Sequence, residues 1–344
     1  MRKSKSIDVD ATRADYKRRL WNAKNLIILT LSASIILYII LTLISAYNNA
    51  EAFGNYISSI KWYYYLLALL TVFAADVIAF PKWALYSRLL NIKMGTRKSF
   101  ELYMSLNAMN ITPGRWGRAI ASYLIKKSKG IGVGHTFPAV VADIFTDFVG
   151  FGIVSVFFSF IIHRYFIESL FLVLIFFIPF IFLFSNRAYK LIKRKLEKHR
   201  RLAAIFENGD QYFQSSKKFS KRTYVYSLLF TVPSNILSGV SLYFIMLAFG
   251  VHVSAAYIPT IIFIYCIVTL LGMVSGIPGS LGVAEVSLLA LLIVFFKPLG
   301  VGLSLATLIT IFARVAMLWW VELYGFIFLA YVLRTMKTLE GKTK

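Results

Sequence analysis

The sequence predicts an all-α, polytopic membrane protein: a helical bundle of about eight spans, with two broken, re-entrant segments in pseudo-repeated halves. Composition is the first reason, because 58% of the 344 residues are hydrophobic and only 15% are charged, whereas soluble domains have about 25% charged residues. The second is a series of apolar runs near the roughly 20 residues that a helix needs to cross a bilayer. The third is a pair of short blocks rich in Pro and Gly. Such interruptions are tolerated at membrane depth only inside protein or beside a water-filled cavity.

Eight apolar runs are candidate spans. The first carries no charge and is too long for the apolar core of a signal peptide, so we expect it to be a membrane helix. The seventh is short and is expected to be a half-helix or one arm of a re-entrant pair, and the eighth is long enough to tilt or protrude. The expected spans are Leu26–Tyr47, Trp62–Phe80, Thr136–Ile162, Tyr165–Ser185, Tyr224–Phe249, Ala255–Ser275, Val283–Phe296 and Val301–Leu333.

Basic residues lie in every second connection between the spans. The chain has 38 Lys and Arg against 15 Asp and Glu, a net charge of +23, which in a soluble protein would indicate a nucleic-acid partner. Here the alternation predicts orientation instead: a multi-pass protein of the cell membrane with both termini cytoplasmic and no nucleic-acid partner. We divide the chain into a cytoplasmic N-terminal segment (1–25), a transmembrane domain (26–333) with a basic cytoplasmic loop (186–223), and a cytoplasmic tail (334–344).

The sequence offers little for metal or redox chemistry. Cys266 is the only cysteine, which rules out an intrachain disulfide and a cysteine-cluster metal site. The four histidines are scattered without the spacing of a zinc site. We expect no metal ion and no cofactor.

The two blocks of helix breakers share one pattern. Residues 112–119 and 277–285 align as Pro-Gly-x-x-Gly-x-Ala. Paired Gly/Pro interruptions at corresponding positions of two halves are the best pointer in a sequence to a transporter's binding site. With two spans before and two after each block, the halves would share one orientation. The expected structural hinges are Pro113, Gly114, Gly117, Pro278, Gly279 and Gly282.

The first block is expected to open a helix. Thr112 is a good N-cap and Pro113 suits the first helical position, so Arg115 and Arg118 would share a face in the first turn. Two cations there oppose the helix macrodipole, which favours an anion between them. A phosphate group is one candidate, since free N–H groups and two guanidinium forks bind it well. An internal ion pair and solvation at the membrane interface remain open.

The segment before this block, residues 98–111, is moderately apolar and too short to span. We expect it to be one arm of a re-entrant hairpin with the block at its tip. The alternative is an amphipathic helix lying in the membrane interface. Its Asn107 and Asn110 would line a polar path or bond across helices.

Acidic residues within the spans are costly and are functional candidates by default. Asp143 and Asp147 lie four apart and share a helix face. They would pair with Arg115, Arg118 or Arg314, or else be protonated and carry protons.

Two acids are expected near the last span. Glu285 follows the second block in the first turn of a helix, where an acid suits the dipole. Arg314 is the natural partner of Glu285 or of a bound anion. Glu322 lies eight residues after Arg314, and Asp76 is a further buried acid of the second span.

These features resemble the lysylphosphatidylglycerol synthase transmembrane-region family over roughly residues 20–333. The residues that carry the resemblance are 110–117, 143–147 and, most specifically, 278–285. The resemblance implies a helical bundle with two halves and re-entrant segments, which in fusion members moves aminoacylated phospholipid between leaflets. Because this chain ends shortly after its last expected span, we expect the separate aminoacyl-transfer domain of the fusion members to be absent. The family often has an acid where this chain has Arg118 and a Glu where it has Asp143; the first departure makes the site more cationic and favours a phosphate.

We therefore expect a flippase or transporter of an anionic phospholipid or a polyprenyl-phosphate-linked headgroup, with membrane lipid as its partner. The alternatives are an intramembrane glycosyltransferase-related enzyme or accessory subunit, and a proton-coupled small-solute transporter. An enzyme is less favoured, because the one acid pair with suitable spacing, Asp8 and Asp10, lies in a polar tail; no catalytic residue is assigned. The candidate headgroup-binding residues are Asn110, Arg115, Arg118, Asp143, Asp147, Glu285 and Arg314.

Overall fold

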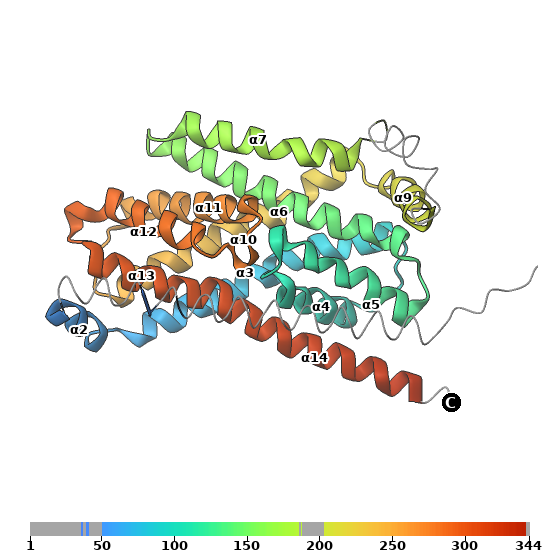
Figure 1. Cartoon of the computed structure of the whole chain (residues 1–344), viewed down its shortest axis with the longest axis horizontal. Helices are drawn as coiled ribbons and strands as arrows, with labels where there is room; N and C mark the ends of the chain where they lie inside the picture. The colour runs from blue at the N-terminus through green and yellow to red at the C-terminus, as the bar shows by residue number, and fades with distance from the viewer. Residues whose placement is uncertain (1–35, 37–38, 41–49, 186, 188–202, 342–344) are drawn as a thin grey trace, which may run out of the picture.

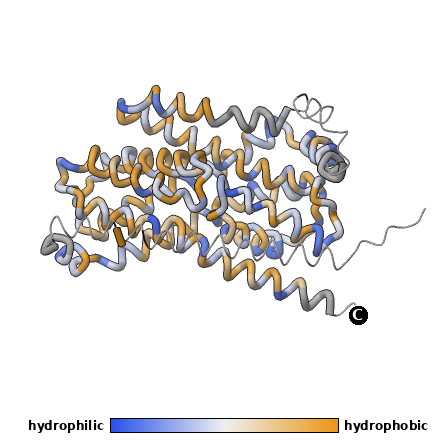
Figure 2. Tube along the Cα trace, viewed as in Figure 1, coloured by the Kyte–Doolittle hydropathy of each residue, from blue (hydrophilic) through white to orange (hydrophobic). Residues whose placement is uncertain are grey.

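A computed structural model describes residues 36, 39–40, 50–185, 187 and 203–341 of the chain. These residues form helices joined by short turns and contain no strand, which confirms the all-α prediction (Figure 1). Hydrophobic residues dominate the length of the helices (Figure 2). Many of them are exposed, such as Leu66, Phe157 and Leu229 at 56%, 57% and 62%. Exposed apolar surface on this scale suits a lipid environment.

Six helical segments of the described residues are long and apolar enough to cross a membrane. A seventh helix, α7 (Phe166–Phe184), occupies the fourth predicted span, and its residues Phe166–Ile175 form a shorter apolar stretch. The first predicted span, 26–47, lies outside the described residues except for residues 36 and 39–40. The six segments are α3 (Trp62–Leu89), α6 (Val133–Ile161), α10 (Lys221–Ala248), α11 (Ile258–Ser275) with the short η4 (Ala255–Tyr257), α12 (Val283–Phe296) between η5 (Pro278–Ser280) and η6 (Lys297–Leu299), and α13 (Leu303–Arg314) continued through the π-turn η7 (Val315–Trp319) into α14 (Trp320–Gly341).

The remaining helices are short. They are α2 (Ala50–Ser58), α4 (Thr96–Ser105), η1 (Leu106–Met109), η2 (Pro113–Ala119), α5 (Ile120–Lys129) and α9 (Ala203–Ser216).

Helices α3 and α10 run antiparallel and define the two ends of the bundle. At one end the Lys61 N–H donates to the carbonyl of Ala248 at 2.9 Å. At the other, the rings of Tyr86 and Phe219 lie 5.2 Å apart. We call the second the basic end, because the exposed lysines and arginines of α4, α5 and the start of α10 gather there.

Two hairpins enter the bundle from opposite ends. The first, α4–η1–η2–α5, leaves from the end of α3 and leads into α6 at the basic end, with η1 fully buried. This confirms the expected re-entrant arm rather than a helix lying in the interface. The second, α11–η5–α12, begins and ends at the opposite end, where the rings of Tyr257 and Phe296 lie 5.7 Å apart. The two hairpins therefore have opposite orientations, and the expectation that both halves share one orientation is wrong for them.

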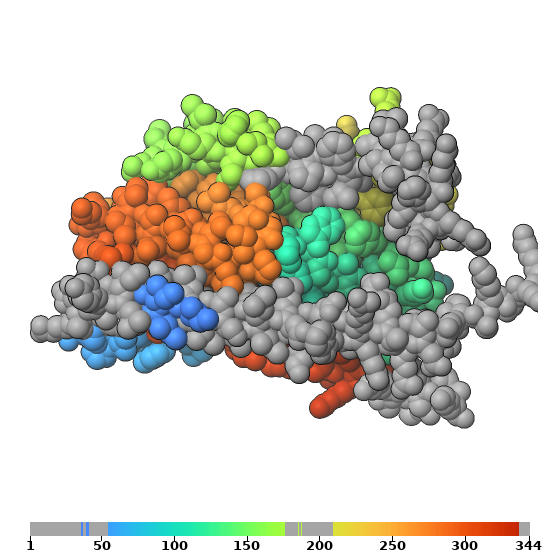
Figure 3. All heavy atoms as spheres, in the orientation of Figure 1, coloured from blue at the N-terminus to red at the C-terminus, as the bar shows by residue number. Residues whose placement is uncertain are grey.

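The tips of the hairpins meet in the middle of the bundle. The Gly279 N–H donates to the carbonyl of Ile111 at 2.7 Å, and a space-filling view shows the two segments side by side (Figure 3). Each hairpin has its own apolar core. Trp83, Tyr103 and Leu106 belong to the core around the first, and the core around the second is built by the buried side chains of α11, α12 and α13.

Candidate functional site

The two Pro-Gly blocks have the same backbone conformation. In each, Pro follows an extended residue, and the next two residues are left-handed: Gly114 and Arg115 with φ of 56° and 61°, Gly279 and Ser280 with φ of 62° and 57°. Left-handed backbone costs about 1–2 kcal/mol for a residue with a Cβ. Arg115 and Ser280 therefore occupy conformations that glycine would adopt more easily.

The prediction that an α-helix begins at Thr112 is wrong. The left-handed pair interrupts it, and regular α-helix starts only at Ile120. Thr112 does not cap the first turn; its Oγ1 accepts a hydrogen bond from the Gly117 N–H at 2.7 Å. A Cβ at Gly117 would lie 2.7 Å from that oxygen, so this hinge needs glycine. Arg115 consequently does not share a regular helix face with Arg118.

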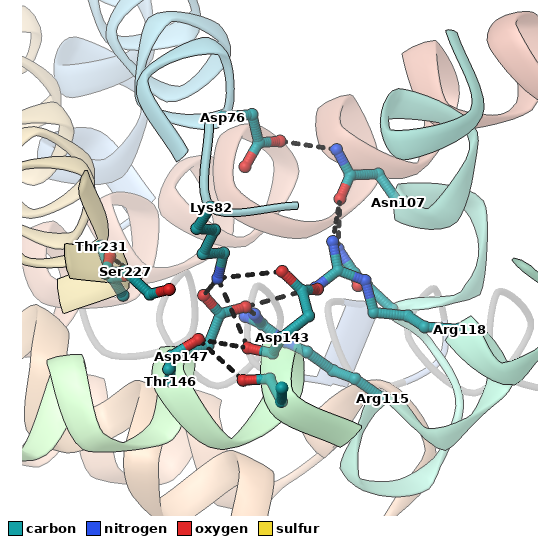
Figure 4. Close-up of polar contacts among 12 residues, drawn as sticks. Asp76, Lys82, Asn107, Arg115, Arg118, Asp143, Thr146, Asp147, Ser227 and Thr231 are labelled. Carbon is teal, nitrogen blue, oxygen red and sulfur yellow. Dashed lines mark hydrogen bonds and ion pairs between the residues drawn. The ribbon is translucent and has the colours of Figure 1, made fainter. Parts of the chain in front are cut away.

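Five ionisable side chains form a charge cluster behind the first block (Figure 4). The Arg118 Nη1 lies 2.7 Å from Asp143 and 3.2 Å from Asp147. Lys82 lies 3.2 Å from Asp143 and also forms an ion pair with Asp147. The Arg115 Nη1 lies 3.3 Å from Asp147. Three cations thus surround two carboxylates, so this cluster carries one positive charge when all five are ionised.

Lys82 is the site residue that the sequence analysis missed. It follows Pro81, just past Phe80, the expected end of the second span, and this position predicts a basic connection rather than a buried site. In the structure α3 continues through Pro81 to Leu89, and Lys82 is fully buried. Only an indirect signal could have indicated Lys82. Two buried carboxylates one turn apart need cations from other helices, because uncompensated buried charge is costly.

Arg115 differs from the other two cations. Lys82 and Arg118 are 0% and 3% exposed, and both are held between the two aspartates. The Arg115 side chain is 22% exposed, and among the described residues its hydrogen bonding uses Nη1 alone. Its guanidinium lies 5.8 Å from the Phe151 ring. Of the three interpretations of the arginines (a phosphate, an internal ion pair and solvation at the interface), internal pairing describes Arg118 fully. Arg115 pairs with Asp147 but, among the described residues, keeps further N–H groups for another partner.

Asn107 connects the charge cluster to other polar side chains. Asn107 donates to Asp76 at 2.7 Å and accepts from Arg118 at 3.5 Å and from Asn110 at 3.2 Å. Tyr324 of α14 also donates to Asp76. The Oδ1 of Asn110 is buried without a hydrogen-bond partner among the described residues. Asn107 thereby connects α3, the first hairpin and the charge cluster.

Arg314 holds the second block. Its Nε donates to Glu285 Oε1 at 2.8 Å, and its Nη2 donates to the carbonyl of Gly279. The other oxygen of Glu285 accepts from the Gly282 N–H at 2.8 Å. The predicted pairing of Arg314 with Glu285 is confirmed, and Glu285 also caps α12 as the dipole argument suggested. The π-turn η7 follows directly after Arg314; single π-turns are frequent at functional sites.

A cavity lies between the two blocks. It contains about 1210 Å³ of space free of atoms, including the part open to solvent. Of the seven predicted headgroup residues, five line it, whereas Asp143 and Glu285 lie behind Arg118 and Arg314 and hold them in place. Asp76 lines it as well. The five are Asn110, Arg115, Arg118, Asp147 and Arg314.

The hinge residues take different places around this cavity. Gly114 and Gly279 line it, and Gly279 also makes the contact between the tips. Gly282 has a φ of 81°, in the left-handed region that favours glycine.

Within the described ranges, no three His, Cys, Asp or Glu side chains gather so as to hold a metal ion.

Fold and site together define a class: a multi-pass helical membrane protein in which two opposed hairpins meet at a charged, polar cavity. The chain belongs to the lysylphosphatidylglycerol synthase transmembrane-region family, whose family model matches residues 26–325. It is similar to a UPF0104 membrane protein of Methanothermobacter thermautotrophicus strain Delta H, with 24% identity over 288 residues, 76% of this chain and 83% of the relative. A second match with a UPF0104 membrane protein of that organism has 30% identity over 130 residues, 38% of this chain and 36% of the relative.

Proposed function

We propose that the protein is a flippase that moves an anionic phospholipid or a polyprenyl-phosphate-linked headgroup between the leaflets of the cell membrane. A charged headgroup has no favourable path through hydrocarbon, because its charges lose their hydration. A polar cavity inside the bundle would replace that hydration while the lipid tails stay in the bilayer.

One observation carries the proposal: the cavity lies where two broken hairpins from opposite ends meet. A binding site reached by hairpins from both ends suits alternating access, because either hairpin can move while the other stays closed. The tips are joined by the Gly279–Ile111 hydrogen bond, and Arg314 of α13 holds the tip of the second hairpin through the Gly279 carbonyl.

Arg115 is the residue we assign to the phosphate. It is partly exposed, lines the cavity and, among the described residues, uses only Nη1 for hydrogen bonding. Guanidinium groups bind phosphate by two parallel hydrogen bonds. Asp147 lies 3.3 Å away and offers Arg115 a partner when no lipid is bound. In the orientation we propose, both termini lie on the cytoplasmic side, as the basic connections predict.

The test is translocation of a headgroup-labelled phosphatidylglycerol in proteoliposomes. Arg115→Ala combined with Glu285→Ala should reduce the rate at least tenfold. The matched control is Arg164→Ala combined with Glu168→Ala. It removes an Arg and a Glu that are exposed at the end of the bundle opposite the basic end, and it should leave the rate unchanged. Equal rates in wild type and in the Arg115/Glu285 variant would overturn the site.

A proton-coupled transporter of small solutes is the second candidate, and one observation favours it. Glu322 is 2% exposed, and neither of its carboxyl oxygens has a hydrogen-bond partner among the described residues. A buried ionisable group within a span is a candidate proton carrier. Proton uptake into vesicles that contain no labelled lipid, abolished by Glu322→Gln, would support this function over the first.

A further inference from the structure

A second hollow of the molecule lies at the basic end and shares no lining residue with the central cavity. Helices α4 and α14 and the end of α5 enclose a groove of about 960 Å³, including the part open to solvent. We propose that this groove binds the headgroup of an anionic phospholipid from the leaflet at the basic end, independently of the proposed transport.

The charge of the groove favours an anion. Among the described residues, Arg97, Lys98 and Lys129 line it together with one acid, Glu101, so three cations face one anion. Glu101 is engaged with Arg97 at 2.9 Å, which leaves the two lysines without an acidic partner in this part of the groove. Ammonium groups at a membrane surface attract anionic lipid.

The floor of the groove is apolar, which distinguishes a lipid from a soluble phosphate. Leu102 and Val332, 3% and 6% exposed, lie beneath the charged rim, flanked by Met94 and Met336. A rim of cations above an apolar floor matches the boundary between a phosphate and the first carbons of its acyl chains. Inorganic phosphate would gain nothing from the floor.

An apolar stripe on α14 leads into this groove. Leu323, Ile327 and Tyr331 are 53%, 62% and 43% exposed, and their spacing of four residues places them on one face of the helix. Tyr331 also lines the groove. A lipid whose phosphate lies between Lys98 and Lys129 can therefore lay a chain along this stripe toward the bilayer interior.

Binding is measured by native mass spectrometry of the full-length protein with short-chain phosphatidylglycerol, phosphatidylcholine and inorganic phosphate. We expect phosphatidylglycerol to bind at least tenfold more tightly than phosphatidylcholine, and inorganic phosphate at millimolar concentration not to displace it. Lys98→Gln with Lys129→Gln should weaken phosphatidylglycerol binding at least tenfold. The control, Lys93→Gln with Lys126→Gln, removes two exposed lysines of the same end that do not line the groove, and should change it less than twofold.

Equal affinity for the two lipids, equal effects of the two double variants, or displacement by inorganic phosphate would overturn the proposal. A second measurement uses wild-type protein and needs no variant. Phosphatidylglycerol with a photoreactive acyl chain should label the α14 peptide that contains Leu323 and Ile327. Labelling confined to other helices would contradict the proposed position of the acyl chain on α14. Headgroup translocation in the Lys98/Lys129 variant separates the two proposals, because a central-cavity flippase should retain it.

Discussion

The backbone N–H of Gly279 donates to the carbonyl oxygen of Ile111 at 2.7 Å, across 168 residues of sequence, and joins the tips of two hairpins that enter from opposite ends. Both residues lie in or next to a Pro-Gly block. Because those blocks are not regular helix, their backbone groups are free to bond to one another instead of within a helix. The junction of the two halves is therefore made by the segments that the sequence marks as broken.

Arg314→Lys should loosen the tip of the second hairpin and, through Gly279, this junction. Lysine keeps a charge for Glu285 but lacks the planar fork that reaches Glu285 and the Gly279 carbonyl together. We expect faster hydrogen–deuterium exchange at the Gly279 amide and in η2. Arg222→Lys, at an exposed position at the start of α10, is the control and should exchange like wild type. Unchanged exchange in both variants would show that Arg314 does not hold the tip.

Lys82→Met should be strongly destabilising. It leaves Asp143 buried and short of one cation, and removing one partner of a buried ion pair costs about 3–5 kcal/mol. Titration with sodium dodecyl sulfate gives the free energy of unfolding. Adding Asp143→Asn should restore part of the loss, because coupled residues are not additive. Lys61→Met, at an exposed position, should have no measurable effect; a similar loss there would point to a general effect of charge.

Arg115→Gly should separate stability from transport. Glycine relieves left-handed strain of about 1–2 kcal/mol, which offsets a partly exposed ion pair worth about 0–1 kcal/mol. Thermal stability should stay close to wild type while headgroup translocation falls at least tenfold. Asn91→Gly relieves the same kind of strain, at a φ of 55° on an exposed turn, and should leave translocation intact. Loss of translocation in both variants would argue against a specific role for Arg115.

Gly325→Ala tests the contact between α14 and the first hairpin. A Cβ there would lie 2.7 Å from the carbonyl carbon of Asn107, a backbone atom that cannot rotate away. Overpacking of this kind costs about 1–3 kcal/mol or more. We expect a lower melting temperature and reduced translocation. Gly54→Ala in α2 has open space around its Cβ and should be neutral or slightly stabilising, since alanine favours helix. A comparable fall in melting temperature in this control would show that overpacking against Asn107 is not the cause.

Much of the site was accessible from sequence. All of its charged residues except Lys82 were identifiable one by one, because ionisable groups and helix breakers stand out within apolar runs. Asp143 and Asp147 were placed on one face by their spacing, and Glu285 was matched to Arg314 by charge. Lys82 was not found, because Pro81 is a local signal for the end of a helix, and the packing of α3 against α10 overrides it.

The sequence by itself determined the class of the protein, its apolar helices and the positions of its two breaks, since these follow from hydrophobicity and backbone chemistry within short windows. Only the tertiary structure decided that the hairpins oppose each other, that Asp143 and Glu285 stand behind the arginines of the cavity, and that Lys82 joins Asp147 from 65 residues away. Such pairings depend on which helices pack together, and packing is set by contacts between residues remote in the chain rather than by local pattern.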